Sequence, residues 1–157
     1  MYQPPEGYSD WPWERSGKDK GGGGLNLIYR KSLNTHKWIP VVPPEYKYVE
    51  KERQWLLIKQ GEKKCAFLHC YIACKGKDDS FLQWNEDLFC LMKEEAIKLR
   101  REGFAVLAMG DFNSRIGRVP GLEGNTPDTN RNQPMFMNFL SEVHLGMPYN
   151  ELIIRFL

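Results

Sequence analysis

The sequence lacks any apolar run long enough to cross a membrane. A membrane-spanning helix needs about 20 consecutive apolar residues, and no run in these 157 residues approaches that length. Residues 1–20, MYQPPEGYSDWPWERSGKDK, also lack the apolar centre of a secretory signal peptide. We therefore expect a protein of the nucleus or cytoplasm that has no membrane partner.

The sequence has little excess charge of either sign. Its 22 Lys and Arg residues against 20 Asp and Glu residues leave a net charge of +2. The overall charge therefore does not point to nucleic acid or to a membrane, and a preference for polyanions has to come from local patches. With 157 residues, of which 41% are hydrophobic, the chain is expected to bury one core and to form one domain.

Cysteines are few, and their spacing does not suit a zinc site. The chain has Cys65, Cys70, Cys74 and Cys90, and no CxxC pair occurs. Because odd and even positions of a strand face opposite sides, Cys65 is expected to point away from Cys70 and Cys74. The pattern favours reduced, packed thiols over disulfides or a zinc site.

The first half of the chain predicts a leader followed by strands. Pro, Gly, Trp and charged residues without periodicity fill residues 1–20, which indicates a loop-like leader. The GGGG run at 21–24 lacks the Gly-Lys-Ser/Thr ending of a P-loop and leads into the strand-like LNLIYRKSL, so we interpret it as a flexible entry to a strand. Further strands are expected at 36–42, 55–59 and 65–72, with a hairpin turn between the last two.

The second half predicts two helices around a buried strand. Apolar residues recur at intervals of three and four between Ser80 and Glu102, with Gly103 after the end. FAVLAM, residues 104–109, is an uninterrupted apolar run, as expected for a strand covered on both faces. Pro134 opens a second amphipathic helix. The succession of strands and helices predicts a layered α/β domain.

Polar residues follow that buried strand directly, in the sequence GDFN. Ligands of α/β sheets collect at the carboxyl ends of strands, and Asp111 comes just after such an end. If the chain stays extended, a period of two places the Asp111 carboxylate and the Asn113 amide on one side and Phe112 on the other. A carboxylate that deprotonates water and an amide that donates to a phosphoryl oxygen suit phosphodiester hydrolysis. Gly, Asp and Asn also form turns, so the tetrapeptide alone leaves an ordinary turn open.

The GDFN stretch resembles the signature of the endonuclease/exonuclease/phosphatase superfamily of metal-dependent phosphodiesterases. GGGGLNLIYRKSLN resembles the family segment in which glycines introduce a strand, and CAFLHCYIAC resembles the central strand that ends in a catalytic tyrosine. DTNRNQPMFMNFLSEVHL resembles the family stretch after the GDFN loop. GDFNSRIGR is most similar to endonuclease domains of LINE-type (non-LTR) retrotransposons, and the match runs from about Gly21 to Leu145.

The resemblance implies an α/β sandwich with a catalytic site at the carboxyl ends of its strands. By this resemblance, Asp111 orients the water or assists the leaving group, Asn113 holds the scissile phosphate, and Tyr71 supports the charge that builds on it. The resemblance also implies Mg²⁺, or Mn²⁺ in its place, as cofactor and DNA as the ancestral substrate. Arg115 and Arg118 stand close enough to the motif to meet backbone phosphates, with solvated loop arginines as the alternative.

Two residues of the central strand also have purely structural interpretations. Without the resemblance, Tyr71 is a packed aromatic residue with a hydrogen-bonded hydroxyl. His69 shares a strand face with Tyr71, and we interpret it as a structural histidine because the resemblance assigns it no role.

Two parts of the family site are missing from the sequence. The family's metal-binding glutamate stands on a strand ahead of the glycine-rich segment, whereas Glu6 and Glu14 lie in loop-like sequence. The closing Ser-Asp-His motif is not found in 146–157, which form a divergent tail, and Cys74 stands where relatives often have a polar DNA-contacting residue. The metal ligands are therefore unknown, and we interpret 21–145 as a partial, truncated domain.

These observations give one leading hypothesis and two alternatives. The leading one is metal-dependent phosphodiester hydrolysis of the DNA-endonuclease type by a weakly active or inactive fragment. The alternatives are a non-catalytic nucleic-acid-binding or interaction module on the same scaffold, and a phosphatase of small phosphorylated substrates. No protein partner follows from the sequence.

Overall fold

The structure, a computed structural model, describes residues 3–13, 24–73, 80–114 and 130–145. The strands within these ranges are β1 (Tyr8–Trp13), β2 (Leu25–Arg30), β3 (Thr35–Trp38), β4 (Arg53–Gln60), β5 (Lys63–Tyr71) and β6 (Ala105–Asp111). The helices are the 3-10 helix η1 (Pro44–Glu52) and the α-helices α1 (Ser80–Arg101) and α2 (Gln133–Glu142). No helix in these ranges has the length and hydrophobicity that a membrane span requires.

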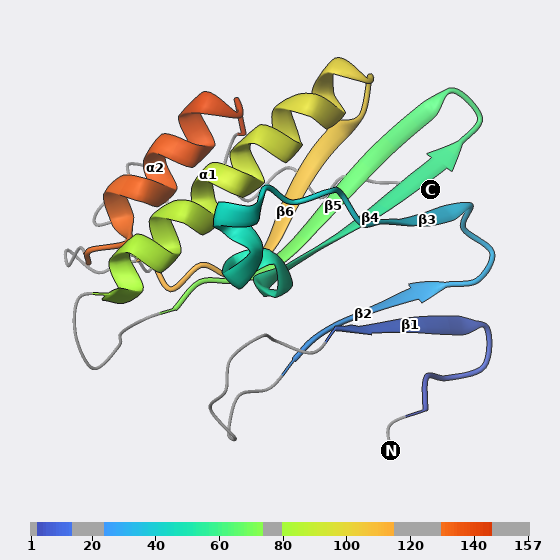
Figure 1. The fold of residues 1–157 in the computed structure, drawn as a ribbon. Helices are drawn as coiled ribbons and strands as arrows, with labels where there is room; N and C mark the ends of the chain where they lie inside the picture. The colour runs from blue at the N-terminus through green and yellow to red at the C-terminus, as the bar shows by residue number, and fades with distance from the viewer. Residues whose placement is uncertain (1–2, 14–23, 74–79, 115–129, 146–157) are drawn as a thin grey trace, which may run out of the picture.

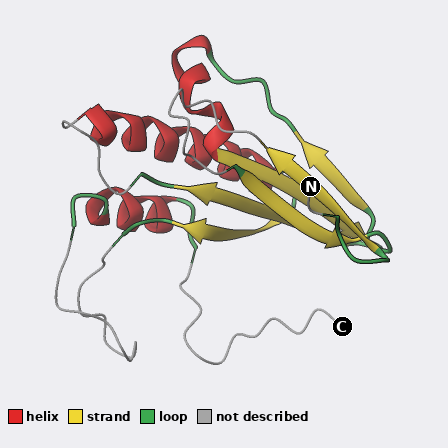
Figure 2. Cartoon of the chain, turned by 90° about the horizontal axis from the view of Figure 1, so that it is seen from below, coloured by secondary structure: helices red, strands yellow, loops and turns green. Residues whose placement is uncertain are grey.

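Four strands form the main sheet, in the order β3-β4-β5-β6. β3, β4 and β5 pair antiparallel, whereas β5 and β6 run parallel, with α1 as the crossover that parallel neighbours require. Figure 1 shows α1 and α2 on one side of this sheet and the two-stranded sheet of β1 and β2 on the other. Figure 2 shows the two helices side by side. The layered α/β sandwich expected from the sequence is therefore confirmed.

The core lies between the main sheet and the helices. Its buried members include Trp55, Leu57, Ala66, Leu68 and Val106 of the sheet and Leu88, Met92 and Leu99 of α1. The periodicity expected between Ser80 and Glu102 is confirmed as α1, which ends at Arg101 ahead of Gly103 at φ +86°. The helix expected at Pro134 is confirmed as α2, with this proline in its first turn.

The expectation of a loop throughout residues 1–20 is wrong, because Tyr8–Trp13 form β1. This strand pairs antiparallel with β2, and Pro12 lies opposite Asn26. A proline is tolerated on a strand that has one paired side, since its missing N–H can face away from the partner. Trp11, which is 5% exposed, anchors the strand in the molecule. Composition alone concealed the strand, because proline, glycine and charged residues without periodicity surround it within residues 1–20.

Two strands differ from their predicted form. The strand expected at 36–42 ends at Trp38, because Pro40 and Pro43 interrupt the pairing with β4. The strand expected at 104–109 is present as β6, but it is covered on one face only. β6 is the last strand of the main sheet, and the β1–β2 sheet leaves Met109 40% exposed.

A buried ion pair joins β4 to α1. Arg53 and Glu95 are 4% and 6% exposed, and Arg53 Nε donates to Glu95 Oε2 at 2.8 Å. Trp55 Nε1 donates to the same oxygen at 2.7 Å, while Arg53 Nη2 donates to Oε1. Both carboxylate oxygens are therefore occupied, which satisfies a charge that has been removed from water.

Glu95→Gln should lower the free energy of unfolding by about 3 to 5 kcal/mol, because it leaves the buried Arg53 guanidinium without its counter-charge. Urea denaturation followed by circular dichroism measures this change. The control is Glu142→Gln, which removes the more exposed pair of Lys93 and Glu142, 2.6 Å apart, and should cost much less because solvent screens this pair. Equal effects of the two substitutions would contradict the prediction.

Candidate functional site

Tyr71 and Asp111 lie next to each other at the carboxyl ends of two parallel strands. They are paired residues in the β5–β6 register, so their side chains leave the same face of the sheet. Tyr71 is half-buried and Asp111 is exposed. The structure thus brings a phenol and a carboxylate together at the edge where α/β folds bind ligands.

Gly110 allows this close approach. It adopts φ +137°, and a Cβ at this position would overlap the carbonyl oxygen of Cys70 on the neighbouring strand. Any other residue would therefore push β6 away from β5 directly before Asp111. The glycine of the GDFN motif is explained by this contact.

Asn113 is not placed by strand periodicity, and that expectation is wrong. The strand ends at Asp111, and Asn113 adopts φ +43°. Its backbone N–H donates to Asp111 Oδ1 at 2.9 Å, which forms a turn, and its side-chain Nδ2 donates to the carbonyl of Ile72 at 2.7 Å. The turn thus holds both residues at the site, and at least one amide hydrogen of Asn113 is used to tie the β6 loop to β5. Phe112 packs on Phe136 with ring centroids 4.7 Å apart.

Further asparagines complete this connection and were not identified from the sequence. Asn85 of α1 accepts from the N–H of Ala73 at 3.1 Å and donates to its carbonyl at 2.8 Å. Asn132 donates to the same carbonyl and to the carbonyl of Asn113, both at 3.0 Å, and Asn130 donates to the latter at 2.6 Å. We call Asn85, Asn113, Asn130 and Asn132 the asparagine cluster.

One sequence signal pointed to this cluster. Asn85 falls within the apolar stripe of α1 and is fully buried, and a polar residue at such a position needs hydrogen-bond partners. Nothing local in the sequence identifies those partners, because they are Ala73, just after β5, and Asn132, just before α2.

Cys70 and His69 are uncharged neighbours of the site. Burial raises the pKa of the Cys70 thiol, and the charge of Asp111 raises it further, so this thiol stays protonated at neutral pH. Burial lowers the pKa of His69, whose Nδ1 lies 3.2 Å from Gln54 Oε1. His69 is therefore a neutral, hydrogen-bonded histidine, as its structural interpretation expected.

The described residues do not form a complete site for a divalent metal ion. Asp111 can offer carboxylate oxygens, but nowhere in residues 3–13, 24–73, 80–114 and 130–145 do three His, Cys, Asp or Glu side chains come together. Mg²⁺ prefers near-octahedral ligation by six oxygen atoms, of which one carboxylate supplies only a small part. Glu6 lies in the turn before β1 and is exposed.

Several residues named from the sequence lie outside the described ranges. These are Glu14, Cys74, Arg115 and Arg118. The phosphate contacts expected of the two arginines stay predictions.

Gly110→Ala should destabilise the fold by more than about 3 kcal/mol, because it adds a clash with the β5 backbone to the strain of a positive φ. Gly103→Ala is the matched control, since Gly103 has φ +86° and open space around a Cβ. That substitution carries backbone strain alone and should cost about 1 kcal/mol. Chemical denaturation of both variants measures the difference, and a smaller loss for Gly110→Ala would refute the proposed close approach.

His69 should make stability depend on pH. The unfolded histidine binds a proton near pH 6.5, whereas the folded one resists protonation because its pKa is lowered. Its contribution is therefore complete above pH 6.5 and is lost as the pH falls toward the folded pKa. His69→Gln should flatten this part of the stability curve in urea titrations between pH 5 and 7.5, and an unchanged curve would contradict the prediction.

Comparisons with known proteins agree with this architecture. No protein-family model matches the sequence, and no curated protein matches it. Among solved structures, the chain is similar to the endonuclease domain of TRAS1, a telomere-specific non-LTR retrotransposon, with a TM-score of 0.53 and 12% sequence identity. The similarity covers 87% of this chain and 52% of that chain, so this protein spans about half the length of that one.

A likeness at this identity concerns the fold and leaves the roles of individual residues as predictions. The resemblance seen in the sequence is confirmed at that level, because the layered sandwich that carries Tyr71 and Asp111 matches the TRAS1 domain. The chain has the α/β fold of a non-LTR retrotransposon endonuclease domain.

Proposed function

We propose that this protein carries a phosphodiester-hydrolysing site of the nuclease type, with DNA as substrate and Tyr71, Asp111 and Asn113 as its residues. The observation that carries the proposal is the pairing of Tyr71 with Asp111 at the carboxyl ends of β5 and β6. The neighbour's description as a retrotransposon endonuclease domain supports nucleic acid as the substrate class.

Each residue has a chemical role in this proposal. The Asp111 carboxylate accepts a proton from a water molecule whose oxygen attacks phosphorus. The P–O bond to the leaving group breaks, and the leaving oxygen keeps the electron pair and takes a proton from solvent water. The Tyr71 phenol donates a hydrogen bond to a phosphoryl oxygen on which charge builds. Asn113 keeps the Asp111 carboxylate in place through its backbone N–H, 2.9 Å from Oδ1, and in this proposal its side-chain amide holds the scissile phosphate.

We further propose that hydrolysis depends on Mg²⁺ or Mn²⁺ and that turnover is low. Such an ion supplies positive charge beside a phosphate. The described residues bring no group of three His, Cys, Asp or Glu side chains together, so the affinity for the ion should be weak.

One observation favours a non-catalytic nucleic-acid-binding module as the second candidate. The Asn113 side chain donates to the carbonyl of Ile72 at 2.7 Å, so part of its hydrogen-bonding capacity holds the fold together. On this alternative, the same edge binds a nucleic-acid backbone without cleaving it.

A nicking assay on supercoiled plasmid with Mg²⁺ or Mn²⁺ tests the site. We expect turnover close to the uncatalysed background, and any nicking should disappear with EDTA and with Asp111→Asn. Asp10→Asn, which removes a carboxylate on β1, is the matched control and should leave nicking unchanged. Strong nicking that both treatments abolish would contradict the low turnover, and strong nicking by Asp111→Asn would contradict the site.

The affinity for DNA tests the same site without depending on turnover. Without metal, Asp111→Asn should bind a short duplex several-fold more tightly at low salt, because it removes repulsion between a carboxylate and the phosphates. An unchanged affinity, or an absence of DNA binding by the unsubstituted protein, would count against a nucleic-acid site at this edge and therefore against both candidates.

A further inference from the structure

A cavity of about 240 Å³ lies where β1, β3, η1 and the start of β4 meet. Trp11, Trp13, Trp38 and Trp55 line it, and these are four of the five tryptophans in the chain. The fifth, Trp84, packs on Tyr48 of η1, with ring centroids 5.0 Å apart. Strands from both sheets therefore contribute tryptophans to one cavity, which we call the tryptophan cavity.

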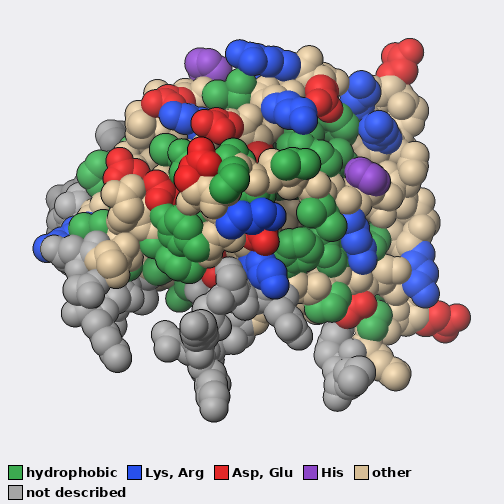
Figure 3. Space-filling view, viewed as in Figure 1, with side chains coloured by type: hydrophobic (Ala, Val, Ile, Leu, Met, Phe, Trp, Pro, Cys, Tyr) green, Lys and Arg blue, Asp and Glu red, His purple; other side chains and the backbone are tan. Residues whose placement is uncertain are grey.

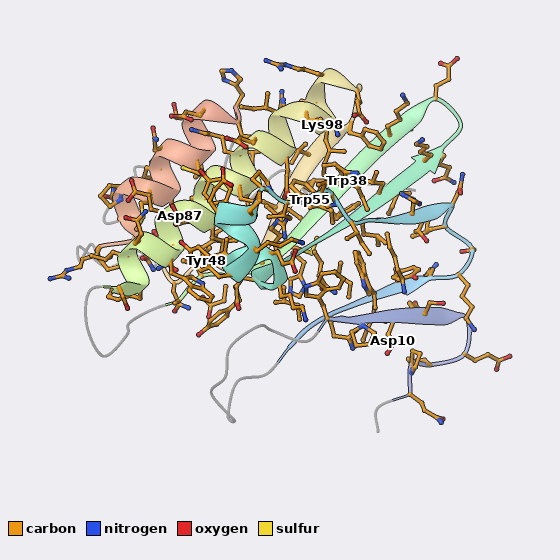
Figure 4. The ribbon with its side chains drawn as sticks, viewed as in Figure 1. Asp10, Trp38, Tyr48, Trp55, Asp87 and Lys98 are labelled. Carbon is orange, nitrogen blue, oxygen red and sulfur yellow. The ribbon has the colours of Figure 1, made fainter. Side chains whose placement is uncertain are left out.

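The indole rings of the cavity form two edge-to-face pairs. The ring centroids of Trp11 and Trp13 are 5.5 Å apart, and those of Trp38 and Trp55 are 6.0 Å apart. Figure 4 shows Trp38 beside Trp55, and Lys98 Nζ lies 5.5 Å from the Trp38 ring centroid. Indole walls suit a planar group, since a nucleobase or a similar ring stacks on tryptophan.

The charged residues of the cavity favour an anionic ligand. Lys47 Nζ pairs with Glu50 at 2.8 Å, and Arg53 is paired with Glu95. Lys51 also lines the cavity and forms no ion pair with any described residue. Figure 3 shows basic, acidic and hydrophobic side chains close together at the centre of the face that is seen in Figure 1. A lysine without a counter-charge repels a cationic ligand and attracts a phosphate.

The tryptophan cavity lies at the same end of the sheet as Tyr71. Gln54 lines it and is paired with His69, and Arg53 is paired with Cys70, the residue before Tyr71. β4 lies directly beside β5. A nucleic-acid strand that passes Tyr71 can therefore reach the cavity across one neighbouring strand.

We propose that the tryptophan cavity binds an unpaired nucleotide, with its base against Trp13 and Trp38, the two partly exposed indoles, and its phosphate next to Lys51. This inference rests on the proposed nucleic-acid function and assigns single-stranded or locally opened nucleic acid to it. The cavity then holds a nucleotide beside the strand segment that Tyr71 and Asp111 contact.

Tryptophan fluorescence measures this binding directly, because four of the five tryptophans line the cavity. The probe is single-stranded octathymidylate, in EDTA so that no cleavage occurs. We expect quenching on binding, and an abasic oligomer of equal length should bind roughly 5- to 100-fold more weakly, as loss of base stacking implies. Equal affinity for the two oligomers would overturn the proposal.

Variants separate the base contact from the phosphate contact. Trp13→Leu should weaken octathymidylate binding at least about fivefold, with its fold checked by circular dichroism, whereas Trp84→Phe should not. Lys51→Gln, a surface change, should weaken binding and reduce the salt slope by about one, whereas Lys31→Gln should do neither. If Lys51→Gln and Trp13→Leu bind like the unsubstituted protein, the cavity is not the site.

The nicking assay and the fluorescence assay test the hydrolytic site and the nucleotide site separately, so either proposal can be refuted without the other. Nicking that persists in Asp111→Asn, together with base-dependent quenching, would remove the proposed hydrolytic site and keep the nucleotide site. Nicking that requires Asp111, without any base-dependent quenching, would keep the hydrolytic site and remove the nucleotide site.

Discussion

The asparagine cluster is the constraint on which the candidate site depends. The carbonyls of Ile72, Ala73 and Asn113 lie just beyond the ends of β5 and β6. Side-chain amides of asparagines donate hydrogen bonds to them, as the backbone N–H groups of a neighbouring strand do within a sheet. A buried carbonyl without a donor would cost more than the net gain of an ordinary hydrogen bond. Because Asn85 is on α1 and Asn132 stands at the start of α2, the cluster also fixes both helices to the strand ends.

A second constraint acts at Gly110, the residue before Asp111. The asparagines can reach their carbonyls because β6 runs close to the end of β5, and that approach requires a residue without a Cβ. The glycine and the amides therefore depend on each other. Together they explain why a glycine, an acid and an amide occur within four residues. The glycine permits β6 to approach β5, the amide of Asn113 holds the two strand ends together by a hydrogen bond, and the carboxylate of Asp111 is exposed to solvent.

The sequence predicted the elements whose pattern is local. The spacing of apolar residues in α1 and the β-rich runs of β4 and β5 each lie within one element, so they were predicted correctly. The missed features depend on distant partners. β1 is a strand because β2 pairs with it, and one face of β6 is uncovered because the β1–β2 sheet does not extend over it. In the site, Asp111 and Tyr71 were found through motifs, whereas the turn at Asn113 and the role of Asn85 arise from tertiary contacts.

The distance along the chain between the clustered groups has a consequence for folding. Asn132 and the Ala73 carbonyl are 59 positions apart, and the parallel pairing of β5 with β6 forms only after the intervening α1 has crossed over. Contacts of such long sequence separation form late and slowly, because loop closure comes first. A chain in which α1 has packed on β4 without these contacts would hold part of the core but not the arrangement of Tyr71, Asp111 and Asn113, so formation of this arrangement would report completion of folding.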